Sequence, residues 1–182
     1  IQNEETGEKL VRRGPDLYTP GPFEKCSDVK DMPVLNDNNY IYVTHEDTGS
    51  IDIVEGPTTL CPGPFDKLSA IKNKIVLSIG DYIKIVDHNS GVVRVEKGPA
   101  TIVLKQYEQV LGSKQRALEV NDHQAVYIFN LDSGEYELVT DHGMFIPAAT
   151  QEIIEARQKV RLEPPEVVVI VDKTGQYAVM TG

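Results

Sequence analysis

The residues that could do chemistry in this sequence are few, and many of them lie in segments typical of turns. Aspartate and asparagine gather at Asp87-His88-Asn89 and around Asp132. Such oxygen ligands can bind Ca²⁺, but these segments lack the twelve-residue loop and the closing bidentate glutamate of a calcium site. Turns favour aspartate and asparagine in any case, because their side chains bond to nearby backbone amides. We therefore interpret these residues as turn formers.

Histidines and cysteines give no pattern of ligands or nucleophiles. The four histidines have no metal-ligand spacing and are expected in solvated loops; they are His45, His88, His123 and His142. Cys26 and Cys61 are too few for a disulfide framework or a four-cysteine zinc site, and no nucleophile signature surrounds Cys26. We expect free thiols in a reducing, cytoplasmic compartment. Phosphate-loop, dinucleotide, serine-hydrolase and zinc-protease motifs do not occur. The sequence predicts neither an enzyme nor a metal or cofactor site.

Charge and hydropathy argue against two further classes. The chain has 18 Lys and Arg against 28 Asp and Glu, a net charge of −10. Nucleic-acid binding needs clustered basic residues, and Arg12-Arg13 is the only adjacent basic pair. The longest aliphatic run, Val167–Val171, is far shorter than the roughly 20 residues that span a bilayer. We expect neither direct nucleic-acid binding nor a transmembrane segment.

Glycine turns recur along the chain at a fixed interval. The first glycine of each pair is Gly7, Gly49, Gly91, Gly134 or Gly175, at intervals of 42, 42, 43 and 41 residues. A second turn follows seven residues later, at Gly14-Pro15, Gly56-Pro57, Gly98-Pro99, Asp141-His142-Gly143 and Gly182. Fixed-period self-similarity of this kind is the signature of a repeat architecture.

Each repeat has the pattern of a β-hairpin followed by shorter strands. The stretches before the first glycine are rich in β-branched and aromatic residues, as in Tyr40–Val43, Tyr82–Val86, Val126–Phe129 and Val167–Val171. After it, apolar residues such as Ile51 and Ile53 alternate with mostly polar ones, the period of a half-buried strand. The Gly-Pro turn ends this strand, since proline lacks the N–H of a central ladder. Third and fourth strands are expected at Thr58–Leu60, Ala100–Leu104 and Met144–Ile146, and at Ile75–Leu77 and Ala117–Val120.

We therefore predict an all-β chain of tandem antiparallel modules of about 42 residues, stacked into an elongated stave. The divisions are a partial repeat at 1–39, repeats at 40–81, 82–124 and 125–166, and the start of a further repeat at 167–182. Both ends fall inside a repeat, which we interpret as cuts within a longer array. Residues 150–161 have a helix-like composition, but the repeat register favours extended structure there.

Two segments carry a more specific pattern. Residues 151–158, Gln-Glu-Ile-Ile-Glu-Ala-Arg-Gln, continue through Leu162, Glu166 and Val169 to Asp172-Lys173-Thr174-Gly175. Residues 82–111 contain Tyr82-Ile83, Asp87-His88-Asn89, Gly98-Pro99 and Tyr107-Glu108-Gln109-Val110-Leu111. Both segments resemble the vault repeats of the major vault protein family, and the likeness in repeat type extends over nearly the whole chain. The repeats here are shorter and more uniform, the chain has no Trp, and Pro-Gly-Pro-Phe at 20–23 and 62–65 is not a family feature.

The resemblance implies a structural function: many copies packed side by side into the wall of a hollow, cytoplasmic ribonucleoprotein particle, with a shoulder domain and cap helix elsewhere in the protein. The expected partners are copies of the chain itself, with enclosed or attached proteins. Two alternatives stay open on the residues alone. One is a monomeric binding module for a protein or glycan, and the other is a propeller, whose blades also have about 42 residues. Because the chain is acidic, we expect assembly to strengthen with ionic strength or at low pH.

Overall fold

The computed structural model describes residues 1–172 and 174–181. Lys173 and Gly182 lie outside the described residues. The last of the expected second turns, at Gly182, is therefore among the residues that are not described. The described residues form strands and turns without a helix, which confirms the predicted all-β class. In chain order the strands are β1 (Gln2–Asn3), β2 (Glu24–Lys25), β3 (Val34–Leu35), β4 (Asn39–His45), β5 (Ile51–Glu55), β6 (Thr58–Thr59), β7 (Asp66–Leu68), β8 (Lys72–Asn73), β9 (Ile75–Leu77), β10 (Asp81–Asp87), β11 (Val93–Lys97), β12 (Ala100–Ile102), β13 (Glu108–Arg116), β14 (Leu118–Val120), β15 (Gln124–Asn130), β16 (Tyr136–Val139), β17 (Gly143–Phe145), β18 (Gln151–Gln158), β19 (Val167–Val171) and β20 (Tyr177–Thr181).

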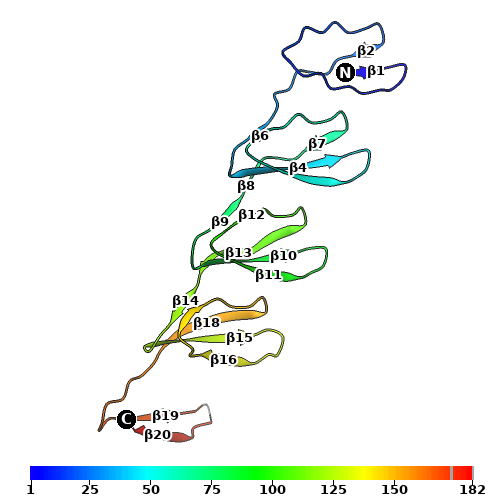
Figure 1. Cartoon of the computed structure of the whole chain (residues 1–182). Coiled ribbons are helices and arrows are strands. Elements are labelled where there is room, and N and C mark those ends of the chain that lie inside the picture. Colours follow the sequence, from blue (N-terminus) through cyan, green and yellow to red (C-terminus); the bar gives the residue numbers. More distant parts are fainter. Residues whose placement is uncertain (173, 182) are drawn as a thin grey trace. The chain divides into compact units, whose positions relative to one another are not determined.

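The chain divides into two compact units, of which the first comprises Ile1–Val76 and Thr101–Glu108. Its main sheet has β4 at the centre (Figure 1). β5 pairs antiparallel with one edge of β4, while β7 and β8 pair with successive parts of the other edge. The short strands β3 and β6 pair separately. The predicted hairpin of β4 and β5 is thus the centre of a larger antiparallel module.

The second unit, Leu77–Ala100 and Gln109–Gly182, contains the same arrangement twice (Figure 1). β10 lies between β11 and β13, and β15 lies between β16 and β18. β14 pairs with β17 as β3 pairs with β6 in the first unit. β18 covers residues 151–158 of the segment 150–161, which has a helix-like composition, so the predicted extended structure is confirmed there. The final hairpin, β19 with β20, is a two-stranded sheet.

The hydrogen bonds between strands place the short strand before a hairpin in the same module as that hairpin. β9 ends at Leu77 and β14 ends at Val120, before the divisions placed at 82 and 125 from the sequence. β9 pairs with β12, the strand after the β10–β11 hairpin. In the same way β14 pairs with β17, the strand after the β15–β16 hairpin. A module defined by hydrogen bonds therefore begins several residues earlier than a repeat counted from its hairpin.

Central strands are buried on both faces. In β4, Tyr40, Ile41, Tyr42 and Val43 are all 5% exposed or less. Alternate side chains of a strand point to opposite faces, and Ile41 and Val43 pack into the core of their own module with Leu35. The corresponding core in the second unit contains Val120, Val126 and Ile128. Tyr40 and Tyr42 lie on the other face, with their rings edge to face at 5.6 Å.

The edge strands differ from the predicted burial. Ile53 on β5, expected on the half-buried face, is exposed, and so is Leu138 at the equivalent position on β16. The next residues, Val54 and Val139, instead pack against the two cores. Val54 pairs with Ile41 and shares the face of its core, whereas Ile53 pairs with Tyr42 on the opposite face.

Candidate functional site

The first-glycine turns close the hairpins with a shared backbone geometry. All five glycines have φ between 70° and 82°, the left-handed region that glycine adopts without steric cost: Gly7, Gly49, Gly91, Gly134 and Gly175. In four of the turns the glycine N–H donates to the carbonyl four residues earlier, at 2.7–2.9 Å; the acceptors are Asn3, His45, Asp87 and Asn130. The sequence period therefore marks a recurring backbone conformation.

Side-chain oxygens cap most of these turns. Oδ1 of the capping residue accepts the backbone N–H two residues later at 2.8–3.0 Å in Asn3, Asp87, Asn130 and Asp172. The hydroxyl of Thr174 also donates to Asp172, and this bond is the main reason that the pKa of Asp172 lies below its ordinary value. Among the described residues, no group of three or more His, Cys, Asp or Glu could hold a metal ion.

The second turns fall into two kinds. β5 ends directly before Gly56-Pro57 and β11 directly before Gly98-Pro99. A Cβ on Gly56 would lie 2.0 Å from the carbonyl oxygen of Asn36, and one on Gly98 would lie 1.9 Å from that of Ser78. Glycine is therefore required there by a close approach of backbone. The other second turns, at Gly14-Pro15 and Gly143, have no such contact. Pro15, Pro57 and Pro99 each follow a cis peptide bond.

A third turn with a polar cap was missed from the sequence. Each cap accepts the backbone N–H of the residue three positions earlier, at 2.7–3.0 Å; the caps are Glu24, Asp66, Glu108 and Gln151. Their spacing of 42, 42 and 43 residues is a signal that the sequence contains. The Pro-Gly-Pro-Phe copies at 20–23 and 62–65 are the first two examples of this turn.

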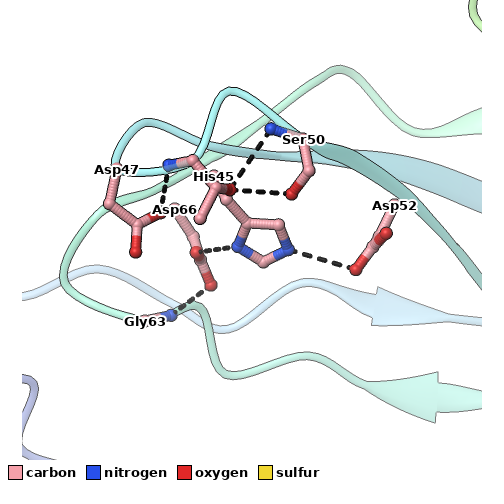
Figure 2. Close-up of polar contacts among 7 residues, drawn as sticks. His45, Asp47, Ser50, Asp52, Gly63 and Asp66 are labelled. Atoms are coloured by element: carbon pink, nitrogen blue, oxygen red, sulfur yellow. Dashed lines mark hydrogen bonds and ion pairs between the residues drawn. The ribbon is translucent and has the colours of Figure 1, made fainter.

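His45 joins two of these turn types. It is the last residue of β4 and stands where other repeats have a capping asparagine or aspartate. Its Nδ1 lies 2.7 Å from Oδ1 of Asp66 on β7, and its Nε2 lies 3.2 Å from Oδ2 of Asp52 on β5 (Figure 2). The other carboxylate oxygen of Asp66 accepts the Gly63 N–H at 2.7 Å. His45 therefore connects both neighbours of its own strand.

The electrostatics of this cluster favour the charged forms of His45 and Asp66. Hydrogen bonds to Asp66 and then to Asp52 raise the pKa of His45 above its ordinary value. The Gly63 N–H is the main cause that lowers the pKa of Asp66, and His45 adds to the shift. The side chains of His45 and Asp66 are 29% and 18% exposed, whereas that of Asp52 is 69% exposed. The prediction of a solvated loop histidine is therefore wrong for His45, because the sequence spacing did not reveal partners on two other strands.

The remaining candidates do not come together in a site. His88 contacts the Gln109 side chain at 2.9 Å, and His142 contacts Asp122 at 3.1 Å. His123 is exposed, and its backbone N–H is accepted by the side chain of Asn121. Cys26 and Cys61 are free and exposed.

Hydrogen bonds at equivalent positions link successive repeats within each unit. In the first unit the hydroxyl of Tyr42 donates to the carbonyl of Leu104 at 2.7 Å. In the second, the ammonium of Lys84 donates to the carbonyls of Ala149 and Gln151 at 3.2 and 2.6 Å. Burial raises the pKa of Tyr42 and lowers that of Lys84. Lys84 also lines a hollow of about 310 Å³, with Tyr82 among its neighbours.

Comparison with models of protein families and with curated proteins finds no match. Among the described residues there is also no helix of sufficient length and apolar character to cross a membrane.

Proposed function

We propose that this chain is a structural repeat segment of a self-assembling shell or scaffold, of the kind found in the major vault protein family. The observation that carries the proposal is the repeated link between neighbouring repeats. Tyr42 and Lys84 occupy the same position one repeat apart, and each donates to backbone carbonyls 62 to 67 residues further along the chain. The stability of a repeat array is approximately the sum of the stabilities of its repeats and of the contacts between neighbours, and these two links contribute to the second term.

Lateral packing of copies is supported by the edge strands. β5, β11 and β16 each form one side of a three-stranded or four-stranded sheet, and apolar residues such as Ile53 and Leu138 are exposed on two of them. Strand edges and exposed apolar faces are surfaces through which β proteins associate. With a net charge of −10, copies repel one another at low ionic strength. The partners in this proposal are copies of the chain, with enclosed or attached proteins.

The proposal also assigns a compartment. Exposed thiols such as Cys26 and Cys61 persist unpaired in a reducing environment, so we assign the segment to the cytoplasm. It has no catalytic function in this account, and it does not bind nucleic acid directly.

The test is static light scattering of the chain across a series of salt concentrations. We expect the mean mass to increase as salt screens the negative charge. A mean mass that decreases as salt rises would contradict this electrostatic account, and complementary ion pairs would then be the better explanation of association.

A second function, a binding module for a protein or glycan, is favoured by one aromatic cluster. On the sheet of β15, β16 and β18, the rings of Tyr127 and Tyr136 are stacked with their centroids 5.4 Å apart. The centroid of the Phe129 ring lies 4.8 Å from that of Tyr136. The guanidinium of Arg157 lies 4.1 Å from the Tyr127 ring centroid. Exposed aromatic faces beside polar groups suit sugars and peptides. Binding on a glycan array that Tyr136→Ala abolishes would support this alternative, and an array without signal would argue against a glycan ligand.

A further inference from the structure

The geometry of the His45 cluster indicates how many protons the imidazole ring carries. A neutral imidazole has one N–H donor and one acceptor nitrogen, whereas an imidazolium has two donors. Ionised carboxylates only accept hydrogen bonds. Both ring nitrogens of His45 face carboxylate oxygens, at 2.7 Å for Asp66 and 3.2 Å for Asp52 (Figure 2). Both contacts are therefore satisfied only when each ring nitrogen carries a proton.

We propose that His45 is a protonation switch within its module. As an imidazolium it fastens the β4–β5 turn to β7, and loss of one proton removes one of the two attachments. A deprotonated nitrogen would then direct its lone pair at a carboxylate oxygen, which is repulsive. This inference concerns one module, and it does not depend on the assembly of copies.

The charged groups that contact the ring act in the same direction. Asp52 faces it from β5, and Asp66 faces it from β7. In the turn, Asp47 directs Oδ1 to the N–H of Thr48 at 2.8 Å. Phe65 precedes Asp66 in the chain, and the ammonium of Lys9 lies 5.2 Å from the centroid of its ring. The groups that touch the imidazole are thus anionic, and they favour its charged form.

The equivalent turns at Asp87 and Asn130 have a capping side-chain oxygen in place of a histidine. Asn130 and Asp87 occupy the position of His45, and their side-chain oxygens cap amides inside their own turns. A capping asparagine does not titrate, so the cap of the Asn130 turn does not depend on a proton. His45→Asn therefore supplies a matched control, because it gives this turn a cap that the same fold already uses.

The direction of the pH dependence follows from the shifts. Since the folded-state pKa of His45 is raised, its stabilisation is complete below the ordinary histidine value of about 6.5 and is lost as pH rises through the raised value. The pKa of Asp66 is lowered, so its contribution is present above the ordinary aspartate value and is lost as pH falls through the lowered value. The attachment is strongest between these limits, in mildly acidic solution.

The test is an NMR titration of the full chain that follows the ¹⁵N signals of His45 and the hydrogen exchange of the Glu46 amide. That amide donates to the Phe65 carbonyl at 2.9 Å, across the attachment. We expect His45 to titrate above about 6.5 with both ring nitrogens protonated at mildly acidic pH. The protection factor of the Glu46 amide should fall as His45 loses its proton, by about tenfold for each unit of raised pKa.

Two variants make the result decisive. Asp66→Asn keeps the shape of the side chain and removes its charge, so it should lower the pKa of His45. His45→Asn should remove the pH dependence of Glu46 protection while the amides of other modules exchange as before. The proposal is overturned if His45 titrates at or below the ordinary value, or if Glu46 protection has the same pH dependence in His45→Asn as in the unchanged chain.

Discussion

Replacing Gly98 by alanine tests whether the second turn requires glycine because of space. The added Cβ would lie 1.9 Å from the carbonyl oxygen of Ser78 and 2.8 Å from its carbonyl carbon. These are backbone atoms, so no change of rotamer can relieve the clash. The backbone must move by about 1.1 Å to restore even the closest contact that real Cβ atoms make. The same carbonyl accepts the Asp81 N–H at 3.0 Å, so the movement also disturbs the entry to β10.

We expect Gly98→Ala to lower the free energy of unfolding of its module by about 3 kcal/mol, the upper part of the range for overpacked sites. The assay is urea unfolding with hydrogen exchange of the Gly98 amide, which donates to Asp81 at 2.8 Å. Gly14→Ala is the matched control. Gly14 also precedes a proline, but a Cβ there would meet only the Asp16 nitrogen at 3.8 Å, so the change should stay within about 0.5 kcal/mol. Equal stability of the two variants would refute the reasoning.

Three further predictions concern other parts of the repeat. Gly91→Ala adds a side chain in open space but at a φ of 71°, so we expect a loss of about 1 kcal/mol in urea unfolding; no loss would show that the left-handed turn is not strained by alanine. Ile128→Ala, at a fully buried position, should lower the free energy of unfolding by about 3 kcal/mol. Val169→Ala, at the equivalent position but 55% exposed, should change it by less than about 0.5 kcal/mol. Similar losses in the two variants would contradict the assigned burial. Tyr42→Phe keeps the ring and removes the hydroxyl that donates to a backbone carbonyl, so hydrogen exchange should report a loss of about 1 kcal/mol in the first unit, and unchanged exchange would show that this link contributes nothing.

The hairpins could be predicted because their signals are local. A β-rich stretch, a glycine at a fixed position and a second turn seven residues later lie within one short segment, and glycine is the residue that adopts the positive φ of the first turn. β10 with β11 and β15 with β16 formed where the sequence placed them. The repeat register also favoured extended structure at residues 150–161, although their composition is helix-like, and β18 covers 151–158 of them.

The burial of the edge strands and the role of His45 depend on residues that are distant in sequence. Ile53 is exposed because it pairs with Tyr42, on the face of the sheet opposite the Ile41 and Val43 core, whereas Val54 pairs with Ile41 and packs on that core. His45 acquires its partners only when β7 brings Asp66, 21 residues later, beside the end of β4. A spacing search for metal ligands could not detect a contact that is set by strand pairing.

The measurement that tests the central proposal most directly is the mass and shape of the native full-length protein, by light scattering and negative-stain electron microscopy. The account predicts a large hollow particle whose wall consists of regular copies packed side by side. A monodisperse monomer at every salt concentration and pH would contradict self-assembly, and the aromatic cluster around Tyr136 would then direct attention to a binding module.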